Sequence, residues 1–251
     1  MLEICCGSFE DAMIAHECGI QRIELNSALS LGGLTPSLGS LIMTKQYTDL
    51  EVASMVRARA AGFCYTDYQF EQMVEDMKLL LAYGTDAIVF GFLKEDQTID
   101  ERKTEEFVQC IHGEGRKAVF HRAFDCVKDS HRAMEQLISL GVDRVLTSGQ
   151  EETAEQGIPL LRELQESYGN KIELLAGCGV NETNAKKIMD ETGITQIHSS
   201  CKGWGNDVTT VGEKVTYAVY DKDLEQSYEM ADYEKIQKLI SAVESSYSKN
   251  I

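Results

Sequence analysis

Carboxylate and imidazole side chains stand at the ends of several apolar runs in this 251-residue sequence. Glu24, His121 and His198 each end such a run, and Asp125 follows four residues after His121. Histidine and carboxylate groups transfer protons near neutral pH when their surroundings shift the pKa. The candidate acid–base residues are therefore Glu24, His121, Asp125 and His198.

Each of these residues also has a structural interpretation. His121 can be a ligand, a proton shuttle or a hydrogen-bonding residue of the framework. Glu24 can pair with His121 as base and acid, or with Arg57 as an ion pair. Glu3 lies within the first apolar run and is expected to join the same polar network, because an isolated buried charge is costly.

Two arginines end another apolar run. Arg57 and Arg59 have the same parity, so in an extended strand they point the same way. Two guanidinium groups suit a bidentate carboxylate or phosphate. The alternative is internal pairing with Glu3 or Glu24, and the two arrangements can coexist.

A glycine-rich turn, Ala176-Gly177-Cys178-Gly179-Val180-Asn181, precedes a predicted helix. Backbone N–H groups in such a turn favour an anion, and in many barrels this region holds phosphate. The alternative is a tight turn without a ligand. The residues expected to bind a phosphate or carboxylate are Arg57, Arg59, Arg122, Ser148, Gly177, Gly179, Asn181 and Ser199.

Eight cysteines include several at strand ends. Cys5 and Cys6 are adjacent in a strand, so they point to opposite faces and cannot chelate together. No CxxC pair is present, which argues against a zinc finger or a thioredoxin-like site. A soft-metal site assembled from separate strand ends remains open, with Cys5, Cys178 and Cys201 as candidate ligands for Cu(I) or Zn²⁺.

Alternating strands and helices must position these residues. Four glycines, at 19, 84, 141 and 193, each follow an amphipathic run and precede a β-branched run, as expected of helix caps before strands. Four further strands fall between them, and the pattern predicts a (β/α)8 TIM barrel over about residues 1–200. The further strands are Leu2–Cys6, Glu51–Arg57, Lys117–His121 and Lys171–Ala176. The predicted helices are Ser8–Cys18, Ser37–Lys45, Tyr68–Tyr83, Ile99–His112, Ser130–Leu140, Thr153–Tyr168 and Glu182–Glu191.

The last part of the chain, about residues 201–251, has a different pattern. Val208–Val211 and Lys214–Tyr220 alternate around Gly212-Glu213, which predicts a hairpin inserted over the top of the barrel. Apolar residues from Tyr233 to Val243 then recur at helical spacing and predict a closing helix. We expect residues 1–251 to form a single domain.

Composition narrows the functional classes. With 24 basic and 41 acidic residues, the formal net charge is −17, which argues against nucleic acid or an anionic membrane surface as partner. Met1 leads straight into a strand and no apolar run reaches the length of a membrane span, so we expect neither a signal peptide nor a membrane anchor. The cysteines are then expected to stay reduced in the cytoplasm.

Six stretches at these same positions form a distinctive combined pattern. They are Arg22-Ile23-Glu24-Leu25 with Ser27-Ala28-Leu29, Gly32-Gly33-Leu34-Thr35-Pro36-Ser37, Arg57-x-Arg59, His121-Arg122-Ala123-Phe124-Asp125, Leu146-Thr147-Ser148-Gly149-Gln150 and Gly179-Val180-Asn181. In them the chain resembles the CutC family of copper homeostasis proteins. The resemblance implies a cytoplasmic TIM barrel associated with copper, Cu(I) binding through cysteines, and self-association as a homodimer.

The chain departs from the family pattern at three positions. Asn26 stands where the family often has cysteine, Ala58 replaces a proline, and Cys178 replaces a glycine. The first change removes one of a pair of thiols and leaves Cys5. Two functions are therefore expected: a copper homeostasis protein binding Cu(I), or a barrel enzyme acting on a small anionic metabolite.

Overall fold

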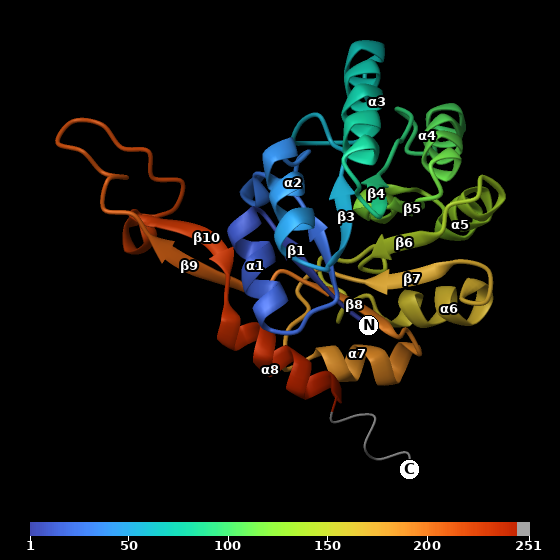
Figure 1. The fold of residues 1–251 in the computed structure, drawn as a ribbon. Coiled ribbons are helices and arrows are strands. Elements are labelled where there is room, and N and C mark those ends of the chain that lie inside the picture. The colour runs from blue at the N-terminus through green and yellow to red at the C-terminus, as the bar shows by residue number, and fades with distance from the viewer. Residues whose placement is uncertain (245–251) are drawn as a thin grey trace.

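A closed parallel barrel forms the centre of the protein (Figure 1). The computed structural model describes residues 1–244, and within them eight strands pair in sequence order, with the last pairing back onto the first. This confirms the predicted (β/α)8 architecture. The strands are β1 (Leu2–Cys6), β2 (Arg22–Leu25), β3 (Glu51–Met55), β4 (Ala87–Phe90), β5 (Lys117–Phe120), β6 (Arg144–Thr147), β7 (Glu173–Ala176) and β8 (Gln196–Ser199).

Helices surround the barrel and pack their apolar sides onto it (Figure 1). Most begin at a side chain that caps free backbone N–H groups, such as Ser8, Thr66 and Asp129. The helices are α1 (Phe9–Glu17), α2 (Leu38–Tyr47), α3 (Asp67–Ala82), α4 (Glu101–Gly113), α5 (Ser130–Ser139), α6 (Ile158–Tyr168), α7 (Ala185–Thr192) and α8 (Tyr233–Glu244), with short 3-10 turns at Leu29–Leu31, Arg122–Cys126 and Lys222–Leu224. None of the helices within residues 1–244 is long and apolar enough to cross a membrane.

The four predicted cap glycines all adopt the left-handed conformation, with φ between 74° and 90°. Two helix starts differ from the prediction by three residues or more. α6 begins at Ile158 rather than Thr153, because the side chains of Thr153 and Gln156 hold the preceding residues in a turn. Gly157 ends this turn, where a Cβ would lie 1.8 Å from the Ser148 carbonyl oxygen. α7 begins at Ala185 because the side chains of Asn181 and Asn184 hold the preceding residues in a turn.

A hairpin follows the barrel, as predicted, but the residues predicted to form its strands were wrong. β9 (Lys202–Asn206) and β10 (Ser227–Ala231) pair antiparallel and project from the barrel, as Figure 1 shows. The predicted strands 208–211 and 214–220 share only the bridge between Val211 and Thr216 within the described chain. Alternation there did not mark a buried face, since Val208 and Tyr217 are 68% and 82% exposed. The closing helix is confirmed as α8, and residues 245–251 of this predicted region lie outside the described residues.

A network of charged side chains lies inside the barrel near the amino ends of its strands, below the level of the strand ends that carry the predicted site. Glu3 on β1 is buried between Arg22 on β2 and Arg144 on β6, at 2.7 Å from Arg22 Nε and 3.8 Å from Arg144 Nη1. Arg144 also binds Glu173 on β7. Burial would raise the pKa of Glu3, but His198 and the two arginines outweigh it and hold that pKa below its usual value. Glu3 thus pairs with Arg22 and Arg144, and not with Arg57 as one alternative proposed.

Replacing Glu3 tests how much this network contributes to stability. Glu3→Gln leaves the buried Arg22 guanidinium without a carboxylate and Arg144 with Glu173 alone, so we expect the free energy of unfolding to fall by about 3–5 kcal/mol. Urea denaturation followed by circular dichroism measures the change. The matched control is Glu75→Gln, which removes an exposed pair with Lys78 and should cost at most about 0.5 kcal/mol. Equal small losses in both variants would contradict a stabilising role for Glu3.

Candidate functional site

A cavity of about 450 Å³, here called the mouth cavity, opens at the carboxyl ends of the barrel strands. Its lining mixes apolar side chains, such as Met55, Phe63 and Leu146, with polar groups from strands around the barrel. The polar residues that line it are Cys5, Glu24, Asn26, Arg57, His121, Arg122, Cys178, His198, Ser199, Ser200, Lys202 and Glu229. A concave, mostly apolar pocket with a few convergent polar groups is typical of a ligand site.

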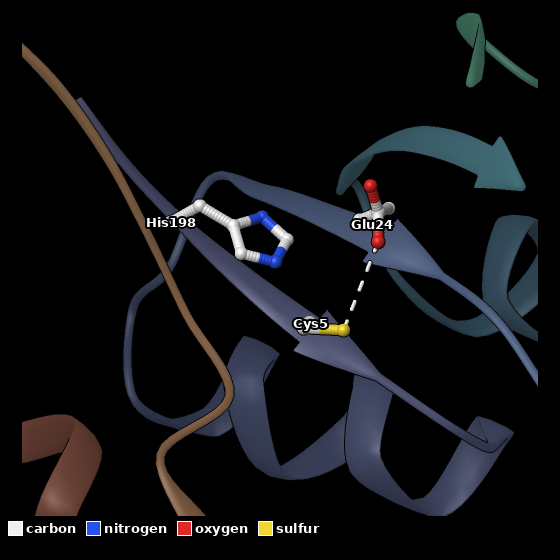
Figure 2. Close-up of side chains that lie close together, drawn as sticks. All are labelled: Cys5, Glu24 and His198. Atoms are coloured by element: carbon white, nitrogen blue, oxygen red, sulfur yellow. Dashed lines mark hydrogen bonds between the residues drawn. The ribbon is translucent and has the colours of Figure 1, made fainter. Parts of the chain in front are cut away.

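Three potential metal ligands meet on one side of the mouth cavity. Cys5, Glu24 and His198 come from the neighbouring strands β1, β2 and β8, and one ligand atom from each lies within 4.8 Å of the other two (Figure 2). The Cys5 thiol donates to Glu24 Oε2 at 3.7 Å. Strand pairing explains the meeting, since Cys5 is the register partner of Glu24. Cys6 is fully buried in the apolar core, which confirms that the two cysteines face opposite ways.

Glu3 orients the imidazole of His198. His198 Nδ1 lies 2.8 Å from Glu3 Oε1, so Nε2 is the nitrogen available to the mouth cavity. Metal-binding histidines commonly bind a carboxylate through their other nitrogen in this way. Burial would lower the pKa of His198, but Glu24 and Glu3 outweigh it and raise that pKa above its usual value.

Burial favours the protonated forms of the other two members of the cluster, Cys5 and Glu24. It raises the pKa of the Cys5 thiol well above its ordinary value, and the nearby Glu24 carboxylate raises it further. Burial also raises the pKa of Glu24, partly offset by His198. A cation entering the cluster would displace these protons, because thiolate and carboxylate are the binding forms.

The opposite side of the mouth cavity carries hydrogen-bond donors. Arg57 is buried, and its Nη atoms donate to the carbonyls of Leu31, Gly33 and Ala61 at 3.1, 2.9 and 2.6 Å. β3 ends at Met55, so Arg57 lies in the following loop and the strand-parity argument does not apply to it.

His121 is a neutral donor. Its Nδ1 accepts the Ala123 N–H at 3.1 Å, which assigns the ring proton to Nε2. Burial, followed by the charges of Arg57 and Arg122, lowers its pKa to about 3. Its Nε2 has no hydrogen-bond partner within the described chain, so the pairing with Glu24 that the sequence suggested is not formed.

Several predicted site residues hold loops instead of lining the cavity. Arg59 donates to the carbonyls of Ala60, Gly62 and Cys64. Asp125 binds Arg122 at 2.8 Å and accepts from the Ser148 amide and hydroxyl. Arg122 itself does line the cavity, whereas Arg59, Asp125 and Ser148 do not.

The glycine-rich turn after β7 uses much of its hydrogen-bonding capacity internally. The Gly177 N–H donates to Thr147 O, and the Asn181 N–H donates to Asn184 Oδ1. The Ser199 hydroxyl donates to Val180 O. Gly179 and Ser199 line the mouth cavity, whereas Gly177 and Asn181 lie outside it.

The three predicted cysteine ligands do not converge. Cys178 lines the cavity, but its thiol donates to the Glu152 carbonyl at 3.1 Å. Cys201 belongs to the apolar core, with its sulfur 3.5 Å from Ser199 Oγ. Within residues 1–244 the one group of three possible metal ligands is Cys5, Glu24 and His198. Sequence reasoning assigned Glu24 and His198 to catalysis, and the closure of β8 onto β1 is what joins them to Cys5.

Comparison of the sequence and the fold with known proteins identifies the family of this chain. The CutC family model matches residues 1–203. The chain belongs to the CutC family. A family protein CutC from Treponema denticola is 46% identical over 245 residues, covering 96% of this chain and 98% of the relative. A human copper homeostasis protein cutC homolog is 39% identical over 202 residues, covering 80% and 73%. The crystal structure of CutC from Streptococcus agalactiae superposes with a TM-score of 0.75 at 32% identity, covering 80% of this chain and 98% of that one.

Asn26 bears directly on the metal cluster of this CutC-family chain. Its amide Nδ2 donates to Glu24 Oε2 at 2.8 Å and lies 3.4 Å from Cys5 Sγ. A cysteine at this position would therefore be adjacent to Cys5. The amide supplies hydrogen bonds there, but not a second thiol.

The pKa values of the two mouth-cavity histidines should lie on opposite sides of the ordinary histidine value. We expect His121 to remain the neutral Nε2–H tautomer at pH 5, because its pKa is about 3. His198 should keep its second proton above pH 6.5, because Glu24 and Glu3 stabilise the cation. Long-range ¹H–¹⁵N NMR of the histidine rings measures both, with His121→Asn assigning the signals.

Protonation of His121 destabilises the folded protein, because burial lowers the pKa of this histidine on folding. Its folded pKa is below the unfolded value of about 6.5, so its contribution is complete above pH 6.5 and is lost as the pH falls towards 3. His121→Asn should flatten that part of the stability profile. A His121 ring that becomes doubly protonated near pH 6.5 would contradict the burial argument.

Proposed function

We propose that this CutC-family chain acts in copper homeostasis in the cytoplasm by binding one Cu(I) ion through Cys5 and His198, with Glu24 beside them. The observation that carries the proposal is the convergence of the three ligand atoms within 4.8 Å, with Glu3 orienting the imidazole. The copper name of the human relative supports the choice of metal. Eight free cysteines fit a reducing compartment. The expected homodimer stays a prediction for measurement in solution.

The ligand types decide what the cluster can hold. Thiolate and imidazole suit Cu(I) and Zn²⁺, whereas Mg²⁺ and Ca²⁺ prefer sets of oxygen ligands. Cysteine and carboxylate bind metals in the deprotonated form, so binding releases protons and strengthens as the pH rises. Metal affinity and proton release therefore report on the same residues.

Anaerobic titration tests the copper proposal. We expect the reduced protein to bind one equivalent of Cu(I) in competition with a chromogenic chelator, more tightly at pH 8 than at pH 6. Cys5→Ser and His198→Gln should each lose this binding, because each removes a ligand atom. The same titration with Zn²⁺ identifies which metal the cluster prefers.

Two matched variants complete this experiment. Cys178→Ser should bind Cu(I) as the wild type does, because its thiol is engaged by Glu152 O rather than by the cluster. Asn26→Cys should bind Cu(I) more tightly, because it places a second thiol beside Cys5. Copper binding that survives Cys5→Ser and disappears in Cys178→Ser would overturn the proposed ligands.

A second function, chemistry on a small phosphate- or carboxylate-bearing metabolite, is favoured by one specific observation. Glu24 and His198, both with raised pKa values, line the same mouth cavity as Arg57 and His121. Acid–base groups on one side and anion-binding donors on the other are the parts needed for proton transfer to a bound anion.

Solvent exchange tests this second function without knowledge of the substrate. The metal-free protein is incubated in D₂O with a panel of small carboxylates and phosphates, and NMR follows deuterium entering carbon positions. We expect at least one compound to exchange, and Glu24→Gln to abolish the exchange because the amide cannot take up the proton. Glu75→Gln, which changes an exposed pair outside the cavity, should exchange as the wild type does. If no panel member exchanges faster with the wild-type protein than without protein, proton-transfer chemistry on these compounds is excluded.

A further inference from the structure

The mouth cavity contains a buried positive charge without a counter-ion. Three arginines are buried within residues 1–244, and Arg22 and Arg144 both pair with carboxylates. Arg57 has no carboxylate within 4.0 Å among the described residues; its Nη atoms bind three carbonyls and its Nε has no hydrogen-bond partner there. The Tyr65 hydroxyl lies beside the Arg57 guanidinium, but burial raises the pKa of Tyr65, so it stays neutral and supplies no negative charge. An unpaired buried charge is costly, so this position favours an anion supplied from outside.

A second free donor belongs to the same side of the cavity. His121 Nε2–H is buried and has no partner within the described chain, while Nδ1 is engaged by Ala123. Phe63 lies against both groups, with its ring 5.3 Å from Arg57 Cζ and 4.8 Å from the His121 ring. The Arg57 guanidinium and the His121 Nε2–H, both packed against the Phe63 ring, can donate hydrogen bonds to the oxygen atoms of a bound ligand.

The other cations that line the cavity already have partners. Arg122 binds Asp125 at 2.8 Å, and Lys202 binds Glu229 at 2.8 Å. His198 is paired with Glu3 at 2.8 Å and His121 is neutral, so Arg57 contributes the one uncompensated positive charge among the described cations of the lining. A single charge matches a monoanion better than the dianion of a phosphate ester at neutral pH.

We propose that the mouth cavity binds a small hydroxy- or ketocarboxylate, with its carboxylate at Arg57 and His121 and its second oxygen towards Glu24 and His198. The apolar lining from Met55, Phe63 and Leu146 accommodates the carbon chain. This refines the second function proposed above by naming the ligand class, and it concerns binding rather than turnover.

The polar asymmetry of the cavity supports a ligand with two oxygen-bearing ends. Arg57 and His121 follow β3 and β5, whereas Glu24 and His198 belong to β2 and β8. Both Glu24 and His198 line the cavity and can form hydrogen bonds with a hydroxyl or keto oxygen of the ligand. The turn after β7 is less suited to binding a phosphate, because the Gly177 and Asn181 N–H groups already donate to Thr147 O and Asn184 Oδ1.

Binding to the metal-free, reduced protein tests the proposal with glycolate, pyruvate and inorganic phosphate as probes. We expect glycolate or pyruvate to shift the His121 Nε2–H signal in NMR and to bind more tightly than phosphate. His121→Asn keeps an acceptor for the Ala123 N–H but removes Nε2–H, so it should weaken binding about tenfold or more. Arg57→Lys keeps the charge but loses Nε–H and should weaken binding as well.

Matched controls are His16→Asn, on the surface of α1, and Arg59→Lys, outside the cavity lining. If Arg57→Lys fails to fold, His121→Asn decides alone. Phosphate binding more tightly than both carboxylates, or carboxylate binding unchanged in His121→Asn, would overturn the proposal, as would no binding of any probe. Carboxylate binding without deuterium exchange would uphold the site while rejecting the second function.

Discussion

The buried carboxylate of Glu3 is the constraint on which the rest of the barrel interior depends. It lies between Arg22 and Arg144 at the lower end of the barrel, and its other oxygen binds His198. This side chain therefore neutralises Arg22, shares Arg144 with Glu173, and fixes the orientation of the imidazole in the mouth cavity. The arginine network inside the barrel and the position of the His198 ring in the mouth cavity both depend on this carboxylate. A movement of Glu3 would therefore change the stability of the barrel and the geometry of the cavity together.

The polar groups of the mouth cavity differ between its two sides. The side formed by β8, β1 and β2 carries a thiol, a carboxyl and an imidazole, which are possible metal ligands, and the side formed by the loops after β3 and β5 carries the guanidinium of Arg57 and the Nε2–H of His121. Burial explains both halves: it raises the pKa values of Cys5 and Glu24 and lowers that of His121. A cation and an anion each have a preferred side in one cavity.

The sequence was sufficient for the barrel but not for the grouping of its site residues. Glycine caps and β-branched runs repeat along the chain, so local chemistry predicts the order of elements. Which strand ends meet depends on register and closure, and those set Cys5 opposite Glu24 and Glu3 opposite His198. The hairpin was misplaced because alternation in 208–220 is exposed, whereas the true strands, 202–206 and 227–231, contain glycine and polar residues that hide the period-two pattern.

The position of Arg57 near the end of β3 was predicted from the sequence, but its contacts in the folded protein were not. The same guanidinium that was expected to bind an anion holds three carbonyls of the loops around it, so it positions the wall of the cavity. Those carbonyls are neutral and use the Nη atoms, so they satisfy hydrogen bonds without cancelling the charge. The structural role and the anion-binding role are therefore compatible: the loops hold the arginine rigidly, and its charge and its Nε–H remain for a ligand.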